Sequence, residues 1–177
     1  MKLTYKAYNP NKKFIDTFGH TGKYSRRDPD GYHTGDCVVR SLTKLTGLDF
    51  MTVASNVAVG HGYRNVNEVT SGNQLGSSIY WLRNLGVVEV DLPQRMVGKS
   101  LNTAVAELRK DDSFLRDYGI SSWKDIYISW NVTRHQVTTK NYTLYDSWDS
   151  SSRRTRGTCF IASDNSQLNK KFDWSSL

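Results

Sequence analysis

Cysteine is scarce in this chain: Cys37 and Cys159 are its only two cysteines. Two cysteines are too few for the disulfide framework of a small secreted domain. They could form a single bridge in an oxidising compartment, and that bridge would exclude a catalytic role for either thiol. We expect a reducing, cytoplasmic setting in which both thiols are free. Each thiol can then be a packing residue or a nucleophile.

The chain also lacks a long apolar run and an apolar segment near its first residues. A membrane-spanning helix needs roughly 20 apolar residues, and a secretory leader needs an apolar core. We therefore expect no membrane contact. With 177 residues, of which 37% are hydrophobic and 12% aromatic, the composition is typical of one folded domain. A domain of this size needs no metal or disulfide for stability, and we expect no cofactor.

A long basic run is missing too, although the formal net charge is +7. The basic residues form short clusters, and no DNA-binding pattern accompanies them. A solvated basic surface is the simpler interpretation of this charge. Nucleic-acid binding through residues 153–156 stays open as an alternative, and it predicts an affinity that falls steeply with salt.

Hydrophobic spacing separates a helical part at 35–110 from a polar, turn-rich lead-in at 1–34. Apolar residues at helical spacing predict helices at 37–46, 49–59, about 74–85 and from 101 to about 108. Short strands are expected at 87–90 and around Thr4. Asp36 and Ser100 are expected to cap the helices that follow them, and Gly47 and Gly60 to end the helices before them.

From about residue 125 the hydrophobic period changes to two, which is typical of strands. Strands are expected at 126–130, 135–139, 142–145 and 158–162. A tight turn at Lys140 and Asn141 would join the second strand to the third. A helical first part of the chain followed by an antiparallel meander indicates an α+β fold. We expect one domain, 1–177, with a C-terminal antiparallel sheet at 125–163 and the helices packed to one side of it.

Cys37 lies at the expected start of the first helix. The partial positive charge of a helix N-terminus favours the thiolate, which is the nucleophilic form of cysteine. A cysteine at such a position is more often a small buried hydrophobic residue, so position alone is weak support for catalysis. Cys159 is flanked by apolar residues in a strand and is expected to be inert packing.

A cysteine nucleophile needs a base. Of the four histidines, His20, His33 and His61 lie in glycine-rich loops, and His135 begins an expected strand. A base at the start of a strand is held by the rigidity of the sheet, which catalytic geometry requires. His135 is therefore the predicted base for Cys37.

The base in turn needs an orienting acid. A two-residue turn at Lys140 and Asn141 pairs His135 directly across the strands with Asp146, and both side chains then share one face. Together with the thiol, this pairing predicts a Cys-His-Asp triad. Asp149 is the alternative to Asp146 as the orienting acid.

Three segments carry a family resemblance. The run GDCVVRSL at 35–42 is similar to the nucleophile helix of small papain-like cysteine peptidase-type proteins of tailed phages and bacteria. RHQV at 134–137 and LYDSWD at 144–149 resemble their histidine strand and the adjacent strand end. The resemblance implies a papain-like cysteine hydrolase, a peptidase or amidase that cleaves an amide or isopeptide bond of a peptide or protein through a thioester acyl-enzyme. It implies Cys37 as nucleophile, His135 as general base and then acid, and Asp146 as orienting acid.

The resemblance also implies an oxyanion site formed by the backbone N–H of Cys37 and one side-chain donor. In papain-like enzymes that donor is usually a glutamine before the cysteine, and this chain has none there. The nearest candidates are Tyr32, His33 and Thr34. One such donor contributes roughly 2.7–4 kcal/mol. A papain-like fold without full activity, used by a phage to bind a host factor or to assist the virion, therefore stays open as the alternative.

Overall fold

The computed structural model of the protein describes residues 2–10, 36–62 and 79–169. Its helices are α2 (Cys37–Thr46), α3 (Phe50–His61), α4 (Ile79–Asn84) and α5 (Leu101–Lys110), with short 3-10 helices η3 (Gln94–Met96), η4 (Ser113–Tyr118) and η5 (Gln167–Asn169). Its strands are β1 (Thr4–Ala7), β2 (Val87–Asp91), β3 (Tyr127–Val132), β4 (His135–Lys140), β5 (Thr143–Asp146) and β6 (Thr155–Ala162). No helix within the described ranges is long and apolar enough to cross a membrane.

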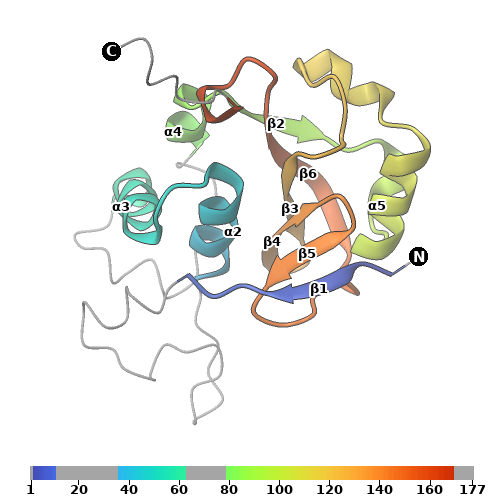
Figure 1. Ribbon diagram of the computed structural model, residues 1–177, viewed down its shortest axis with the longest axis horizontal. Helices are drawn as coiled ribbons and strands as arrows, with labels where there is room; N and C mark the ends of the chain where they lie inside the picture. The colour runs from blue at the N-terminus through green and yellow to red at the C-terminus, as the bar shows by residue number, and fades with distance from the viewer. Residues whose placement is uncertain (1, 11–35, 63–78, 170–177) are drawn as a thin grey trace.

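These strands form one six-stranded sheet in the order β1-β5-β4-β3-β6-β2. All neighbouring strands in it are antiparallel except β1, which runs parallel to β5. The expected α+β class is confirmed, since helices from the first half of the chain pack on a mostly antiparallel sheet (Figure 1). The sheet expected at 125–163 was too small, because β1 and β2, which come earlier in the chain, each add an edge strand.

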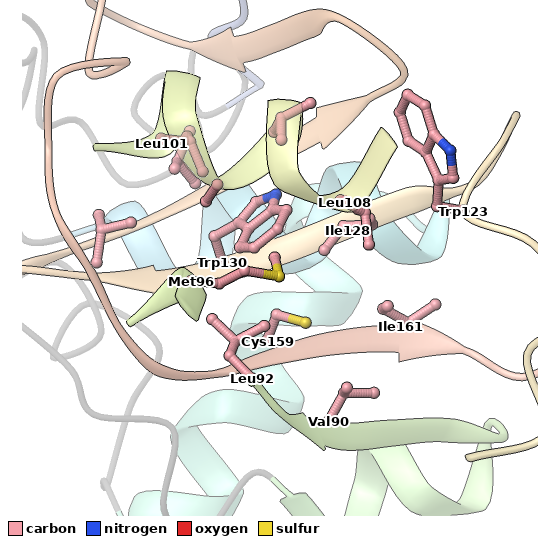
Figure 2. Packing of buried hydrophobic residues seen from close by; sticks show 14 of the residues in the cluster. Val90, Leu92, Met96, Leu101, Leu108, Trp123, Ile128, Trp130, Cys159 and Ile161 are labelled. Atoms are coloured by element: carbon pink, nitrogen blue, oxygen red, sulfur yellow. The ribbon is translucent and has the colours of Figure 1, made fainter. Parts of the chain in front are cut away.

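The helices cover both faces of the sheet, which corrects the expectation that they pack to one side (Figure 1). On one face, Leu42 of α2 belongs to the same buried cluster as Phe160 of β6. On the other face, Leu108 of α5 packs with Trp130 and Cys159 (Figure 2). Cys159 and Phe160 are neighbours in the chain but lie in opposite clusters, because successive side chains of a strand point to opposite faces.

Local capping explains where two of the helices begin. The Asp49 carboxylate accepts hydrogen bonds from the backbone N–H groups of Met51 and Thr52, at 3.0 and 3.1 Å, and starts α3. The Ser100 hydroxyl accepts one from the N–H of Thr103 at 3.2 Å and starts α5 as expected. Both side chains satisfy N–H groups that have no partner within the helix itself.

Left-handed glycines end helices α2 and α3. Gly47 has a φ of 71° and ends α2 as expected. The predicted end of α3 at Gly60 was wrong, because the helix continues to His61 and Gly62 takes the left-handed conformation with a φ of 70°. The first part of the helix expected at 74–85 lies outside the described residues, and the described part begins at Ile79.

Candidate active site

Cys37 is the first residue of α2, and its side chain is half-buried. The helix is held in place by apolar residues such as Val38 and Leu42, which pack toward the sheet. Asp36 occupies the N-cap position, but its side chain makes no capping hydrogen bond. It accepts a hydrogen bond from Arg40 instead. The thiol therefore sits at the positive end of a well-anchored helix, where the thiolate is favoured.

The hairpin of β4 and β5 brings His135 and Asp146 together, but not through the predicted direct pairing, which was wrong. Lys140 pairs with Thr143, so the turn consists of residues 141 and 142. Asn141, with a φ of 51°, is the first turn residue, and asparagine tolerates this left-handed conformation better than lysine. The register is thus shifted by two positions, which keeps both side chains on one face as diagonal neighbours. His135 Nε2 lies 2.5 Å from Asp146 Oδ2.

The Asp146 carboxylate is buried, and both of its oxygens accept hydrogen bonds. Burial alone would raise its pKa, but the hydrogen bonds from His135 and Ser150 and the charge of Arg40 hold the pKa well below its usual range. Asp146 therefore remains a carboxylate at neutral pH and fixes the orientation of the ring. Its further donors are Ser150 Oγ at 2.5 Å, the Ser147 N–H at 2.7 Å and Arg40 Nη2 at 2.9 Å.

Arg40 is a residue of the site that the sequence pattern did not single out. Its side chain is only 4% exposed and joins two buried carboxylates, Asp36 at 2.5 Å and Asp146 at 2.9 Å. Asp36 directly precedes Cys37, and Asp146 ends β5 and is hydrogen-bonded to His135. Arg40 therefore links the start of α2 to the end of β5. An arginine four residues after an aspartate is a recognised helical ion pair, and this spacing was the available signal.

Buried hydroxyl groups fix α2 on the sheet. Ser41 Oγ lies 2.7 Å from Ser129 Oγ on β3 and 2.6 Å from Thr138 Oγ1 on β4. Thr138 also donates to the Ser41 carbonyl at 2.8 Å, and Gln136 Nε2 donates to Ser129 Oγ at 2.8 Å. Buried polar groups left unpaired would cost free energy, so this network is well specified. Because it joins the helix of the thiol to the strand of His135, it helps to set their separation.

Cys37 and His135 shift each other's protonation. Burial acts to raise the pKa of Cys37. That pKa nevertheless lies below its ordinary value, because the thiolate is favoured by a hydrogen bond to the His135 side chain and by the charges of His135 and Arg40. A backbone hydrogen bond of Gln136 acts in the same direction. Burial acts to lower the pKa of His135, whereas its hydrogen bonds to Asp146 and Cys37 and their negative charges raise it. Both shifts favour a thiolate beside an imidazolium. Since Asp146 occupies Nε2, the nitrogen left for the thiol is Nδ1.

Trp148 forms a wall of the site beside His135. Its ring centroid lies 5.1 Å from that of His135, with the two planes tilted by 40°. Trp148 is 37% exposed, whereas the His135 side chain is only 7% exposed. The guanidinium of Arg153 lies over the indole, 5.2 Å from its centroid. The imidazole is therefore covered by an aromatic ring that itself carries a cation.

The other candidates lie elsewhere. Asp149, the alternative orienting acid, is exposed and accepts the Ser151 N–H at 3.1 Å, while His135 is bonded to Asp146. Cys159 is fully packed, and burial raises the pKa of its thiol, as expected of inert packing. The oxyanion candidates, at 32–34, lie outside the described residues. Within the described ranges, no group of three or more His, Cys, Asp or Glu side chains could hold a metal ion.

No protein-family model, curated protein or solved structure matches the chain. The functional argument therefore depends on the arrangement of its own residues. That arrangement combines a half-buried thiol whose pKa is lowered, an imidazole that can accept and return a proton, and a carboxylate that orients the imidazole. These are the groups that covalent catalysis by cysteine requires.

Replacing Asp146 with asparagine is expected to lower the pKa of His135, because the carboxylate charge and the acceptor on Nε2 are both lost. Replacing Asp149 with asparagine is the matched control and should leave that pKa unchanged. The measurement is an NMR titration of the His135 ring protons in each folded variant. Equal shifts in the two variants would show that Asp146 does not control His135.

Proposed function

We propose that the protein is a papain-like cysteine hydrolase that cleaves an amide bond of a peptide or protein. Cys37 is the nucleophile, His135 the general base and then acid, and Asp146 the orienting acid. The observation that carries the proposal is the 2.5 Å hydrogen bond between His135 and Asp146, in a site where the Cys37 pKa is lowered by His135. Helix α2, which begins with the nucleophile and packs on an antiparallel sheet that carries the base, also agrees with a papain-like arrangement.

In the first half of the reaction, the Cys37 thiolate attacks the carbonyl carbon of the substrate. The backbone N–H of Cys37, at the start of α2, donates to the developing oxyanion. His135 then gives its Nδ1 proton to the leaving amine as the C–N bond breaks, and a thioester with Cys37 remains.

In the second half, His135 takes a proton from a water molecule that attacks the thioester. The C–S bond breaks, the carboxylic acid product leaves, and the thiolate beside the imidazolium is restored. Asp146 stays ionised throughout because Arg40 and two hydrogen-bond donors hold its pKa low. It keeps Nδ1 of the ring directed to the reacting groups.

The test is turnover of a peptide mixture and of a small activated ester, with mass spectrometry of the acylated protein. We expect Cys37→Ala to abolish turnover and His135→Ala to lower kcat about 10²- to 10⁴-fold. The matched control is Cys159→Ala, which removes the buried thiol and should keep turnover. Turnover that survives in Cys37→Ala would refute the proposal. Acylation of Cys37 without release of the acid would also refute it and would favour a binding protein.

A further inference from the structure

Arg153 lies next to the proposed site without being part of the triad. Its guanidinium sits 5.2 Å from the ring centroid of Trp148, and that ring lies 5.1 Å from the ring of His135. The loop between β5 and β6 carries both side chains, and a hydrogen bond of 3.0 Å from the Arg153 N–H to the Ser150 carbonyl closes part of it. Ser150 also donates to Asp146. The position of Arg153 is thus fixed relative to the base.

No acid of the described residues forms an ion pair with Arg153. Within the described part of the chain, Arg153 makes no ion pair and its guanidinium donates no hydrogen bond, whereas Arg40, Arg95 and Arg116 all pair with carboxylates. The acid nearest in sequence, Asp149, is 3.9 Å from Lys2 instead. A guanidinium has five N–H donors. Stacking on an aromatic ring uses its face and leaves these donors at its edge available for a planar anion.

We propose that Arg153, held on Trp148, is an anion subsite that binds a carboxylate of the substrate beside the scissile bond. The proposed function then applies to an acidic peptide, with an Asp or Glu side chain or a terminal carboxylate next to the bond that is cleaved. Guanidinium and carboxylate match in a two-bond geometry, which gives direction as well as charge. The proposal rests on the proposed function in one respect, that the substrate reaches Cys37.

Two alkylating reagents that differ in charge test the subsite. Iodoacetate and iodoacetamide both alkylate the Cys37 sulfur, forming an S–C bond as iodide leaves. They differ in charge, because only iodoacetate carries a carboxylate. Any change in folding or thiol reactivity affects both rates, so the ratio of the two rates reports the anion preference alone. We expect Arg153→Gln to lower the ratio of iodoacetate to iodoacetamide rates about two- to fivefold, the range expected of one partly exposed charge.

Matched variants make the result specific. Arg153→Lys should keep part of the preference, because the charge remains while the two-bond geometry is lost. Arg83→Gln removes an arginine that also lies over an aromatic ring, 5.7 Å from the centroid of Tyr80, but on α4; it should leave the ratio unchanged. A ratio that is the same in Arg153→Gln and in the original protein would overturn the subsite.

Competitors distinguish the source of the anion. A glutamate-rich peptide should slow alkylation of Cys37 in the original protein and less so in Arg153→Gln. Stronger protection by a single-stranded oligonucleotide than by the peptide would overturn the acidic-peptide assignment and favour nucleic acid. Alkylation needs no turnover. If Arg153→Gln lowers the ratio of iodoacetate to iodoacetamide rates as expected but no peptide is hydrolysed, the proposed function alone is refuted. Hydrolysis without a ratio effect would refute the subsite only, and a Cys37 that reacts with neither reagent would refute both.

Discussion

Replacing Arg40 with methionine is expected to lower the free energy of unfolding by about 3–5 kcal/mol. Methionine has a similar length and no charge, so the variant removes the cation that the buried carboxylates of Asp36 and Asp146 share. Transfer of a carboxylate from water to a buried position costs several kcal/mol, and Arg40 offsets much of this cost. Urea-induced unfolding at neutral pH measures the difference.

Arg116→Met is the matched control for this loss. Arg116 pairs with Asp112 at 2.7 Å and at the same spacing of four residues as Arg40 and Asp36, but its side chain is 50% exposed. Exposed ion pairs contribute about 0–1 kcal/mol, so this variant should change the unfolding free energy little. Equal losses in Arg40→Met and Arg116→Met would contradict the role of burial.

The loss of unfolding free energy in Arg40→Met should become smaller as the pH falls. The pKa of Asp146 is lower in the folded protein than in the unfolded chain. Its contribution to stability is therefore present above the unfolded pKa, about 3.9, and disappears as pH falls toward the folded pKa. The difference between the original protein and the variant should shrink below about pH 4. A difference that stays constant through this range would point to packing rather than charge.

The sequence predicted the elements better than it predicted their assembly. The helix starts at Cys37 and after Ser100 follow local apolar spacing, with a capping side chain at Ser100 alone, and the structure has both starts. Helix α5 lies on the opposite face of the sheet from α2. Its position depends on which strands complete the sheet, and the spacing of apolar residues along the chain does not indicate that. β1 pairs with β5 across almost the whole chain, so no short-range pattern indicates its place.

The contact of His135 with Asp146 shows how an error in register can preserve a prediction about a site. The expected turn was one residue too early, which changes the strand register by two. A change of two positions keeps side chains on the same face, whereas a change of one would have separated them. Arg40 was missed for a different reason. Its ion pair with Asp36 follows helical spacing, but its ion pair with Asp146 exists only after the helix packs on the sheet.

Cys37 is expected to react with iodoacetamide at a lower pH than an ordinary thiol, and His135→Ala should move the midpoint of this reaction to higher pH. The thiolate is the reactive form, and His135 favours it through a hydrogen bond and a positive charge. Without the imidazole, burial is the first of the remaining effects, and it raises the pKa. Each unit of rise lowers the thiolate fraction about tenfold at pH values below the pKa. Near pH 6 we therefore expect a slower reaction in His135→Ala than in the original protein.

The same experiment separates the helix from the histidine as the cause of the shift. The N-terminus of α2 contributes about 0.3–1 kcal/mol, which is less than one pKa unit, and it remains in His135→Ala. Alkylation rates from pH 4 to 9, measured by mass spectrometry of the peptide that contains Cys37, give the midpoint in each variant. Cys159, whose pKa is raised by burial, should stay unmodified while the protein is folded and so serves as an internal control. An unchanged midpoint in His135→Ala would assign the reactive thiol to the helix alone and would remove His135 from the proposed mechanism.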